Sequence, residues 1–330
     1  MTSDALGWDA IDARLAELYP DLEPKHYGTL HRFALGGPGP LDGISFYPRD
    51  EPVPHWHIVG YGMSELYAKE TDNPDESGWG FEFTFRVARD TGDTEPPIWA
   101  ANLLQNLARY VFSSGNWFEP GHHMNANGPI WQDYETAVTA LAFTEDPELG
   151  TIDTLHGRMQ FLQVVGLTGD EYAAARQWNT DGVLSLLAEQ APLLVTDLDR
   201  PSLTDDPAVR AAIKAGRARD GSSTGLLMVA GFGWTIEEDT IRLRFKTVTT
   251  AMVAQAVRDR LPHGRELLLD GNNIRVVLRS AEVFAVRRPC DGLLEVDLPA
   301  EAVAALPDAL VPGTHPVPGT SHLIVEVSND

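Results

Sequence analysis

Two pairs of histidines are candidates for metal chemistry. His55 and His57 lie two residues apart in a predicted strand, so their side chains project from the same face. His122 and His123 follow in a predicted loop, and together the two pairs have enough ring nitrogens for a zinc site. However, no Asp or Glu lies within the strand itself, and Trp56 between the first pair is typical of a packed strand. We therefore expect structural histidines and no bound metal.

Residues 68–78 form a predicted loop that is rich in carboxylates. Its acidic residues are Glu70, Asp72, Asp75 and Glu76. They could act as an acid–base pair or as calcium ligands, but they lack the spacing and the glycine of an EF-hand loop. A solvated acidic loop is the simplest interpretation. The alternative is a functional one, in which the loop recognises a basic or histidine-bearing peptide.

The motifs of several common catalytic sites are absent from the sequence. There is no phosphate-binding loop that ends in Lys-Ser/Thr and no H-E-x-x-H helix. Cys290 is the only cysteine, which excludes an intramolecular disulfide and a multi-cysteine zinc site. We therefore expect no catalytic residue and no cofactor, in a protein that is not an enzyme. The alternative is a hydrolase or metal-dependent enzyme that uses His122, His123 and the carboxylates of 68–78.

The composition is that of a globular protein. The chain has 330 residues, of which 43% are hydrophobic and 22% are charged, so it is long enough for two domains. It contains no run of about 20 apolar residues, and its first residues do not have the pattern of a signal peptide. We therefore expect a cytoplasmic protein that does not bind membranes.

The net charge restricts the class of partner. The 25 Lys and Arg residues against 48 Asp and Glu residues give a formal charge of −23. A protein this acidic repels the phosphate backbone, so we do not expect nucleic acid as a partner. Solubility is a sufficient explanation of the charge. The alternative is a basic protein partner whose association the charge accelerates.

Periodicity predicts both strands and helices. Residues 79–89 are the clearest strand, because Trp, Phe and Val alternate with Gly, Glu, Thr and Arg as in a strand with one buried face. Residues 97–114 are the clearest helix, because leucines recur at helical spacing, and 115–129 are a predicted loop. Further helices are predicted at 8–19 with Asp9 as the N-cap, at 171–178, at 182–190 and at 249–262, and further strands at 43–48, 55–63, 159–167 and, in a second sheet, at 226–234, 240–248, 266–280 and 284–288, with a hairpin turn at 270–273.

A change in composition divides the chain. Residues 201–224 are charged, interrupted by Pro and end in Gly, Ser and Thr, which makes them the best candidate for a linker. We expect an N-terminal domain at 1–200 and a C-terminal domain at 225–330. The predicted fold class is α+β, with two domains that each pack a mostly antiparallel or mixed sheet with helices.

Several sequence segments carry a resemblance to a known family. They are HWHIVGYGMSELY (55–67), SGWGFEFTFRVARDTGDTEPPIWAANLLQNLARYVFSSGNWF (77–118), FTEDP (143–147), MQFLQVVGLTGDEYAAARQWN (159–179) and VTDLDR (195–200). Their order and spacing resemble those of the Suppressor of fused family over about residues 8–225. In 226–330 the similarity to the C-terminal domain of animal members is weaker, and the long disordered insertion of animal members is absent.

The resemblance implies a protein that binds and does not catalyse. Animal members sequester Gli transcription factors and clamp a short extended peptide between their two domains, where it adds as a β-strand. Bacterial members, which this sequence resembles in its compactness, are often proposed to be immunity proteins of polymorphic toxin systems. We therefore expect a protein partner, with a toxin or a peptide segment of it favoured.

The resemblance also implies candidate binding residues. Tyr67 matches a tyrosine that lines the peptide groove of the family, and Met252 lies near a leucine that packs on the peptide from the second domain. An acidic residue of the following loop contacts the peptide in the family, and either Asp72 or Asp75 is its counterpart. For Tyr67 and Met252 the alternative is ordinary core packing.

Overall fold

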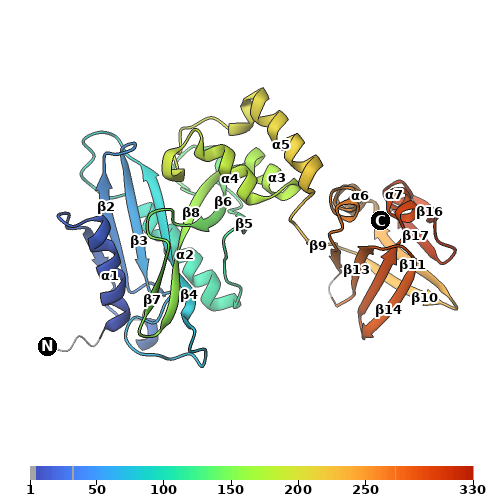
Figure 1. Ribbon diagram of the computed structural model, residues 1–330, viewed down its shortest axis with the longest axis horizontal. Helices are drawn as coiled ribbons and strands as arrows, with labels where there is room; N and C mark the ends of the chain where they lie inside the picture. Colours follow the sequence, from blue (N-terminus) through green and yellow to red (C-terminus); the bar gives the residue numbers. More distant parts are fainter. Residues whose placement is uncertain (1–4, 32, 272, 330) are drawn as a thin grey trace. The chain divides into compact units, whose positions relative to one another are not determined.

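The computed structural model describes residues 5–31, 33–271 and 273–329, and it divides into two compact units. The first consists of Met1–Ala173 with Val183–Asp206, and the second of Ala174–Gly182 with Pro207–Asp330. Both contain β-sheet packed with helices, which confirms the predicted α+β class (Figure 1). Each unit is described by itself.

The first unit is built on one eight-stranded sheet with the order β1-β2-β3-β4-β8-β6-β5, in which β7 also pairs with β8. Most neighbours are antiparallel, and β4 and β8 are parallel. The strands are β1 (Lys25–Gly28), β2 (Gly43–Arg49), β3 (His55–Tyr61), β4 (Glu76–Ala88), β5 (His123–Asn125), β6 (Val138–Glu145), β7 (Thr151–Thr154) and β8 (Gly157–Thr168).

Two helices cover this sheet from opposite sides. The helix α2 (Ile98–Ser114) buries a stripe of apolar side chains against the phenylalanines of β4, and α1 (Leu6–Leu18) packs Ile11 and Leu15 on the other face. The end of α2 is fixed by Gly115, whose φ of 73° is left-handed and whose N–H donates to the Val111 carbonyl at 2.9 Å. The remaining helical segments near this part are the 3-10 turns Phe33–Leu35, Pro192–Leu194 and Leu203–Asp205, and α3 (Gly169–Gln177) and α4 (Thr180–Ala188), which contribute to both units.

The strand predicted at 79–89 is confirmed, but the expectation of a single buried face is wrong. Glu82, Thr84 and Arg86 are as fully buried as the phenylalanines that alternate with them. The reason is that β4 lies in the interior of a sheet covered on both sides. The face that the sequence presents as polar is therefore a polar interior.

Smaller differences concern the ends of elements. The predicted N-cap Asp9 is wrong: α1 begins at Leu6, which leaves Asp9 in the first turn, where its carboxylate faces the positive end of the helix dipole. The predicted loop at 115–129 contains the short strand β5, which pairs with β6. The predicted strand at 43–48 extends one residue further, and the first residues of β4 come from the predicted loop at 68–78.

The second unit has two sheets where the sequence predicted one. Their orders are β10-β11-β17-β16 and β14-β15-β13-β12-β9, and one apolar core joins them through α6 and α7. The predicted helix at 249–262 is confirmed as α6, and residue 272 of the predicted hairpin turn lies outside the described residues. The elements are α5 (Pro207–Asp220), β9 (Leu226–Met228), β10 (Gly233–Glu237), β11 (Thr240–Lys246), α6 (Thr247–Arg260), a 3-10 turn (Leu261–His263), β12 (Leu267–Asp270), β13 (Arg275–Ser280), β14 (Ala285–Cys290), β15 (Leu293–Leu298), α7 (Ala300–Ala309), β16 (Gly313–Pro316) and β17 (Leu323–Ser328).

Most of the predicted linker at 201–224 is packed against this second unit. Arg217 of α5 pairs with the Asp259 carboxylate of α6 at 2.8 Å, and the Ser222 N–H donates to the Asp259 carbonyl at 2.8 Å. Trp178 lies against Gly216, and its indole N–H donates to Asp220 at 2.9 Å. The role of 201–224 as a linker stays a prediction.

Candidate functional site

The chain that leaves β3 is anchored on a buried carboxylate. Glu82 of β4 accepts N–H bonds from Gly62 and Ser64 at 2.9 Å and from Met63 at 3.1 Å, and the Ser64 hydroxyl donates to it at 2.6 Å. Burial raises the pKa of Glu82 to about 7, against the lowering effect of these four donors. The backbone of 62–64 is therefore held in one conformation by a single side chain from the sheet.

A second carboxylate holds the acidic loop that follows. One oxygen of Glu65 accepts the N–H groups of Glu70 and Thr71, both at 2.6 Å, and the other accepts the Lys69 ammonium at 2.8 Å. Burial acts to raise the pKa of Glu65, but these donors outweigh it and lower the pKa to about 2. Glu65 is thus an ionised anchor that folds the start of the loop back on itself.

Gly78 closes the loop against the anchored segment. Its φ of 58° is left-handed, and a Cβ at this position would lie 2.6 Å from the Met63 carbonyl oxygen. The next residue, Trp79, donates its N–H to the same carbonyl at 2.9 Å. The loop therefore begins and ends on the segment that Glu82 fixes.

Between these segments lies a cavity of about 360 Å³ with aromatic walls. The Phe112 ring makes edge contacts with Phe33 and Trp79, at centroid distances of 5.2 and 5.6 Å. Tyr67, predicted as a binding residue, is half-buried, lines the same cavity and packs on the α1 side of the sheet. The cavity is of a size and polarity that suit an apolar or aromatic side chain.

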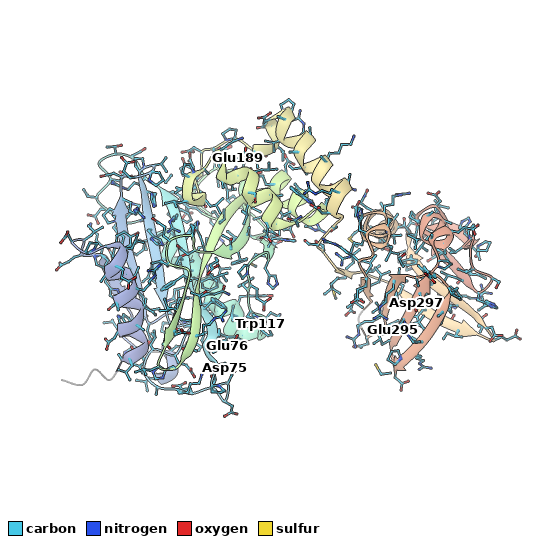
Figure 2. All side chains as sticks on the ribbon, viewed as in Figure 1. Asp75, Glu76, Trp117, Glu189, Glu295 and Asp297 are labelled. Carbon is cyan, nitrogen blue, oxygen red and sulfur yellow. The ribbon has the colours of Figure 1, made fainter. Side chains whose placement is uncertain are left out.

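The predicted acidic residues lie outside this cavity. Asp72 and Asp75 are both exposed, and the Asp75 N–H donates to the Asn73 side chain at 3.0 Å in a local turn. Figure 2 shows Asp75 and Glu76 at the start of β4. The two aspartates therefore belong to the same loop as the cavity wall without contributing to it.

The fourth predicted residue belongs to the second unit. Met252 is in α6, partly buried, and packs against the apolar core of that unit. In the same unit β9 pairs with β12 along one side, and no strand of the described residues pairs with its other side. β9 is thus an edge strand, and an edge strand is the kind of element to which a further strand can be added.

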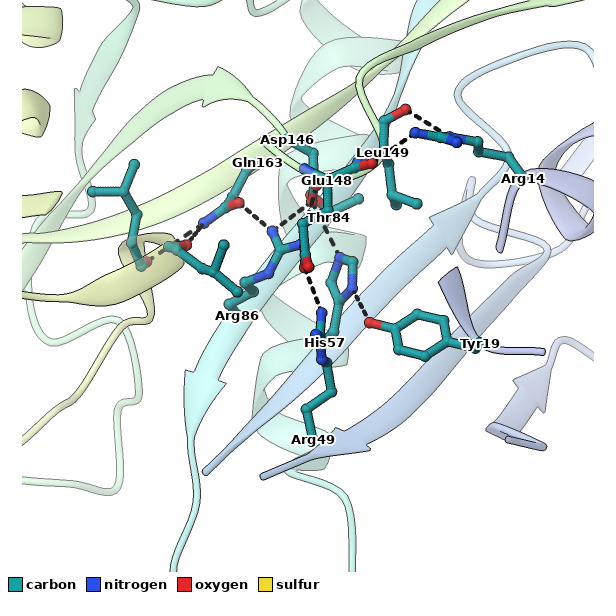
Figure 3. Close-up of polar contacts among 12 residues, drawn as sticks. Arg14, Tyr19, Arg49, His57, Thr84, Arg86, Asp146, Glu148, Leu149 and Gln163 are labelled. Carbon is teal, nitrogen blue, oxygen red and sulfur yellow. Dashed lines mark hydrogen bonds and ion pairs between the residues drawn. The ribbon is translucent and has the colours of Figure 1, made fainter. Parts of the chain in front are cut away.

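The polar interior of the first unit is a continuous hydrogen-bond network (Figure 3). Asp146 accepts bonds from Arg86 at 2.6 and 3.1 Å, from Thr84 at 2.8 Å and from His57 Nε2 at 3.1 Å. His57 Nδ1 lies 2.6 Å from the Tyr19 hydroxyl. Burial and the nearby Arg86 lower the pKa of His57 to about 4, so the ring is neutral, donates to Asp146 and accepts from Tyr19.

The His57–Asp146 pair resembles the histidine–aspartate pair of a catalytic triad, but the centre of the network is shielded from solvent. His57, Arg86 and Asp146 are at most 1% exposed. Each positive charge of the network has a carboxylate partner. Arg86 also bonds Glu148 at 2.9 Å, and Arg49 bonds the same Glu148 carboxylate at 2.5 Å. The arrangement ties β2, β4, β8 and the segment after β6 together.

The remaining histidines do not gather at one site. The His55 ring bonds the Val53 carbonyl at 2.7 Å, His122 lies 3.8 Å from the Glu119 carboxylate, and His123 makes an edge contact with Tyr172 at 5.5 Å. His123 begins β5, and the acidic loop at 68–78 leads into β4. Three strand spacings separate these two strands, or about 14 Å. Within the described residues no group of three or more His, Cys, Asp or Glu is arranged to hold a metal ion.

Apart from Tyr67, the residues that build the site were not predicted from the sequence. Glu65 and Glu82 anchor it, and Phe33, Trp79 and Phe112 form its walls. The sequence held one signal for Glu82: its carboxylate lies in the middle of an aromatic strand. A buried charge at such a position requires hydrogen-bond donors nearby.

Comparison with known proteins agrees with the segments that carry the resemblance. A family model described as Suppressor of fused protein (SUFU) matches residues 37–201, which is half of the chain. The chain belongs to the Suppressor of fused family. The matched residues include β2, β3, β4, the loop at 68–78 and α2, and hence most of the cavity wall.

Suppressor of fused homologues of Homo sapiens and Mus musculus are each 38% identical over 236 residues. The match covers 66% of this chain but only 48% of either homologue, so this chain spans about half the length of the relatives it matches. No helix in the described part of the chain has the length and hydropathy to cross a membrane.

Two solved structures share the fold. A crystal structure of Drosophila Suppressor of Fused has 23% identity and a TM-score of 0.88, and the match covers 98% of this chain and 97% of that one. A crystal structure of a Sufu–Fu complex has 32% identity and a TM-score of 0.60, and the match covers 63% of this chain and 97% of that one.

Proposed function

We propose that this Suppressor of fused family protein is a non-enzymatic binding module that holds a short extended segment of a protein partner. The observation that supports this best is the aromatic cavity beside Tyr67, because its walls are fixed by Glu65 and Glu82 before any partner arrives. A preformed site binds with a smaller loss of conformational entropy.

The proposed contacts divide affinity from specificity. In strand addition the main-chain hydrogen bonds supply affinity, and pockets for alternate side chains supply specificity. We assign one partner side chain to the cavity at Tyr67, and main-chain pairing to an edge such as that of β9. A contact from Met252, as in the clamp of animal members, is part of the proposal, and Asp72 and Asp75 favour a basic or histidine-bearing segment.

The identity of the partner is the finer part of the proposal. A bacterial immunity protein that neutralises a toxin in the cytoplasm fits the compact chain and the net charge of −23, which attracts a basic protein. The Sufu–Fu structure is a complex of a relative with a protein, which supports a protein partner for this chain as well.

Affinity capture from lysate of the native cell, followed by mass spectrometry, tests this proposal. The wild type should capture a partner that Tyr67→Ala loses at least about tenfold. Leu155→Ala is the matched control, because Leu155 is 79% exposed in the turn between β7 and β8 and is not among the residues that line the cavity. Equal capture by Tyr67→Ala and Leu155→Ala would show that the cavity does not bind the partner.

The enzyme alternative has no observation in its favour. His122 lies 3.8 Å from the Glu119 carboxylate, and His123 makes an edge contact with Tyr172. We therefore propose the binding function alone.

A further inference from the structure

The first unit has a second cavity, of about 820 Å³, that the proposed function does not use. It lies where β4 ends and α2 begins. Three of its side chains form a flat aromatic stack: Trp99 and Trp131 are 5.4 Å apart and 3° from parallel, and Trp131 and Tyr134 are 4.9 Å apart and 7° from parallel. Each of the three rings is only partly buried and lines the cavity.

The rest of the lining is acidic. Asp90, Asp93, Glu95, Asp197 and Asp199 all line the cavity, and Arg89 is its one cation among the described residues. Arg89 is already committed, because its guanidinium pairs with Asp50 and lies 5.9 Å from the ring centre of Trp56. Of the five carboxylates, only Glu95 has an ion-pair partner in the described part of the chain, Lys25 at 3.2 Å.

The carboxylates are held in place relative to the aromatic rings. The Tyr134 hydroxyl donates to Asp199 at 2.6 Å, so one ring of the stack positions a carboxylate directly. The segment that carries Asp197 and Asp199 is pinned to β4, since Ala88 N–H donates to the Thr196 carbonyl at 2.9 Å. The cavity thus joins the accessible faces and edges of a stack of three parallel aromatic rings with fixed negative charge.

We propose that this cavity binds an arginine side chain of an extended peptide from a partner protein. A guanidinium is flat, stacks on aromatic faces and pairs with carboxylates, whereas a lysine ammonium is a compact, strongly hydrated charge. The four carboxylates that form no ion pair among the described residues supply the complementary charge.

A peptide fits better than a free small cation because the cavity continues. A neighbouring cavity of about 390 Å³ shares Trp99, Asn102 and Trp131 with it. The 390 Å³ cavity is lined by further amide side chains, including those of Asn106 and Asn125. Amide side chains can donate hydrogen bonds to a peptide backbone and accept them from it. The two together form a groove past the aromatic stack.

The test is a titration of the full-length ¹⁵N-labelled protein, followed by NMR at the indole N–H signals of Trp99 and Trp131. The probe is the capped peptide acetyl-Gly-Ser-Arg-Ser-Gly-amide. The comparison probes carry lysine or citrulline in place of arginine, and citrulline keeps the shape of the side chain without the charge. The arginine peptide should shift both signals saturably, and the citrulline peptide should bind at least about tenfold more weakly.

A pair of double variants separates this site from the overall charge. Asp197→Asn with Asp199→Asn should weaken the arginine peptide at least about fivefold. Asp153→Asn with Glu189→Gln removes the same number of charges at two exposed positions outside the cavity and should change the affinity less than about twofold (Glu189 is labelled in Figure 2).

Three results would overturn the binding of arginine, and a fourth would overturn its peptide context. The first is equal weakening in the two double variants, and the second is equal binding of the citrulline peptide. The third is the absence of shifts at about 10 mM arginine peptide, where even weak sites fill. Arginine amide alone should bind more weakly than the peptide, and equal affinity would refute the peptide part.

Discussion

The Arg86 guanidinium and the Asp146 carboxylate form a two-point pair in the interior of the first unit. Arg86 Nη1 lies 2.6 Å from Asp146 Oδ2, and Nη2 lies 3.1 Å from Oδ1. Arg86 comes from β4, and Asp146 follows β6 directly, so the pair joins distant parts of the sheet. The buried charges are mutually compensated, which makes the loss of either one costly.

We expect Asp146→Asn to lower the free energy of unfolding of the first unit by about 3–5 kcal/mol, because Arg86 loses its principal anion. Urea unfolding followed by tryptophan fluorescence measures this. The exposed Asp153 supplies the control, since Asp153→Asn should cost less than about 0.5 kcal/mol. Equal stability of the two variants would contradict the account of the network.

Two buried groups give the unfolding free energy opposite pH dependences. The pKa of Glu82 is raised to about 7 from 4.5, so the folded state binds more protons between these values and Glu82 costs stability as pH rises. The pKa of His57 is lowered to about 4 from 6.5, so the unfolded state binds more protons and His57 adds stability as pH rises. In the wild type the two effects therefore act in opposite directions between these pH values.

Glu82→Gln removes one of these two effects. Between pH 4.5 and pH 7 the unfolding free energy of the variant should rise relative to that of the wild type by about 3 kcal/mol. Denaturant titrations at several pH values give the two profiles. Parallel profiles would show that Glu82 titrates in the folded protein as it does in the unfolded chain.

The anchor at Glu65 should control the order of the acidic loop. Glu65→Ala removes the acceptor of the Glu70 and Thr71 N–H groups, so hydrogen exchange at these amides should accelerate by about tenfold or more. Exchange followed by mass spectrometry on peptides of 68–76 reports this. Exchange in peptides from β8 should be unchanged, and a loop that exchanges as in the wild type would rule out Glu65 as its anchor.

Charge reversal at Asp72 and Asp75 tests the acidic rim. Both residues are exposed, so Asp72→Lys with Asp75→Lys should leave the thermal midpoint unchanged while weakening partner capture about tenfold. The matched control is Asp21→Lys with Glu189→Lys, which makes the same change in net charge at two other exposed positions. Calorimetry that gives the same affinity for both variants would count against a role of this loop.

Local patterns predicted the elements of the fold but not the site. The alternation in 79–89 and the leucine spacing in 97–114 predicted β4 and α2, because side-chain periodicity depends only on the backbone. The burial of Glu82 and Arg86 depends on partners such as Asp146, which is 60 residues from Arg86. Such partners are set by sheet order, which no local pattern specifies.

The family resemblance supplied a residue that periodicity did not. It pointed to Tyr67, and the structure places Tyr67 in the wall of the aromatic cavity. It also pointed to Asp72, Asp75 and Met252, whose roles in binding stay predictions. The cavity itself combines side chains from the turn at Phe33, from β4 and from α2, so only the three-dimensional structure reveals it.

The most direct test places a photo-crosslinking amino acid, benzoylphenylalanine, at Tyr67 or, as the control, at Leu155. After capture of the partner and irradiation, mass spectrometry locates the crosslinks. The account predicts crosslinks from position 67 to one short stretch of the partner and none from position 155. A captured partner that crosslinks equally from both positions, or from neither, would contradict the proposal that a peptide segment occupies this cavity.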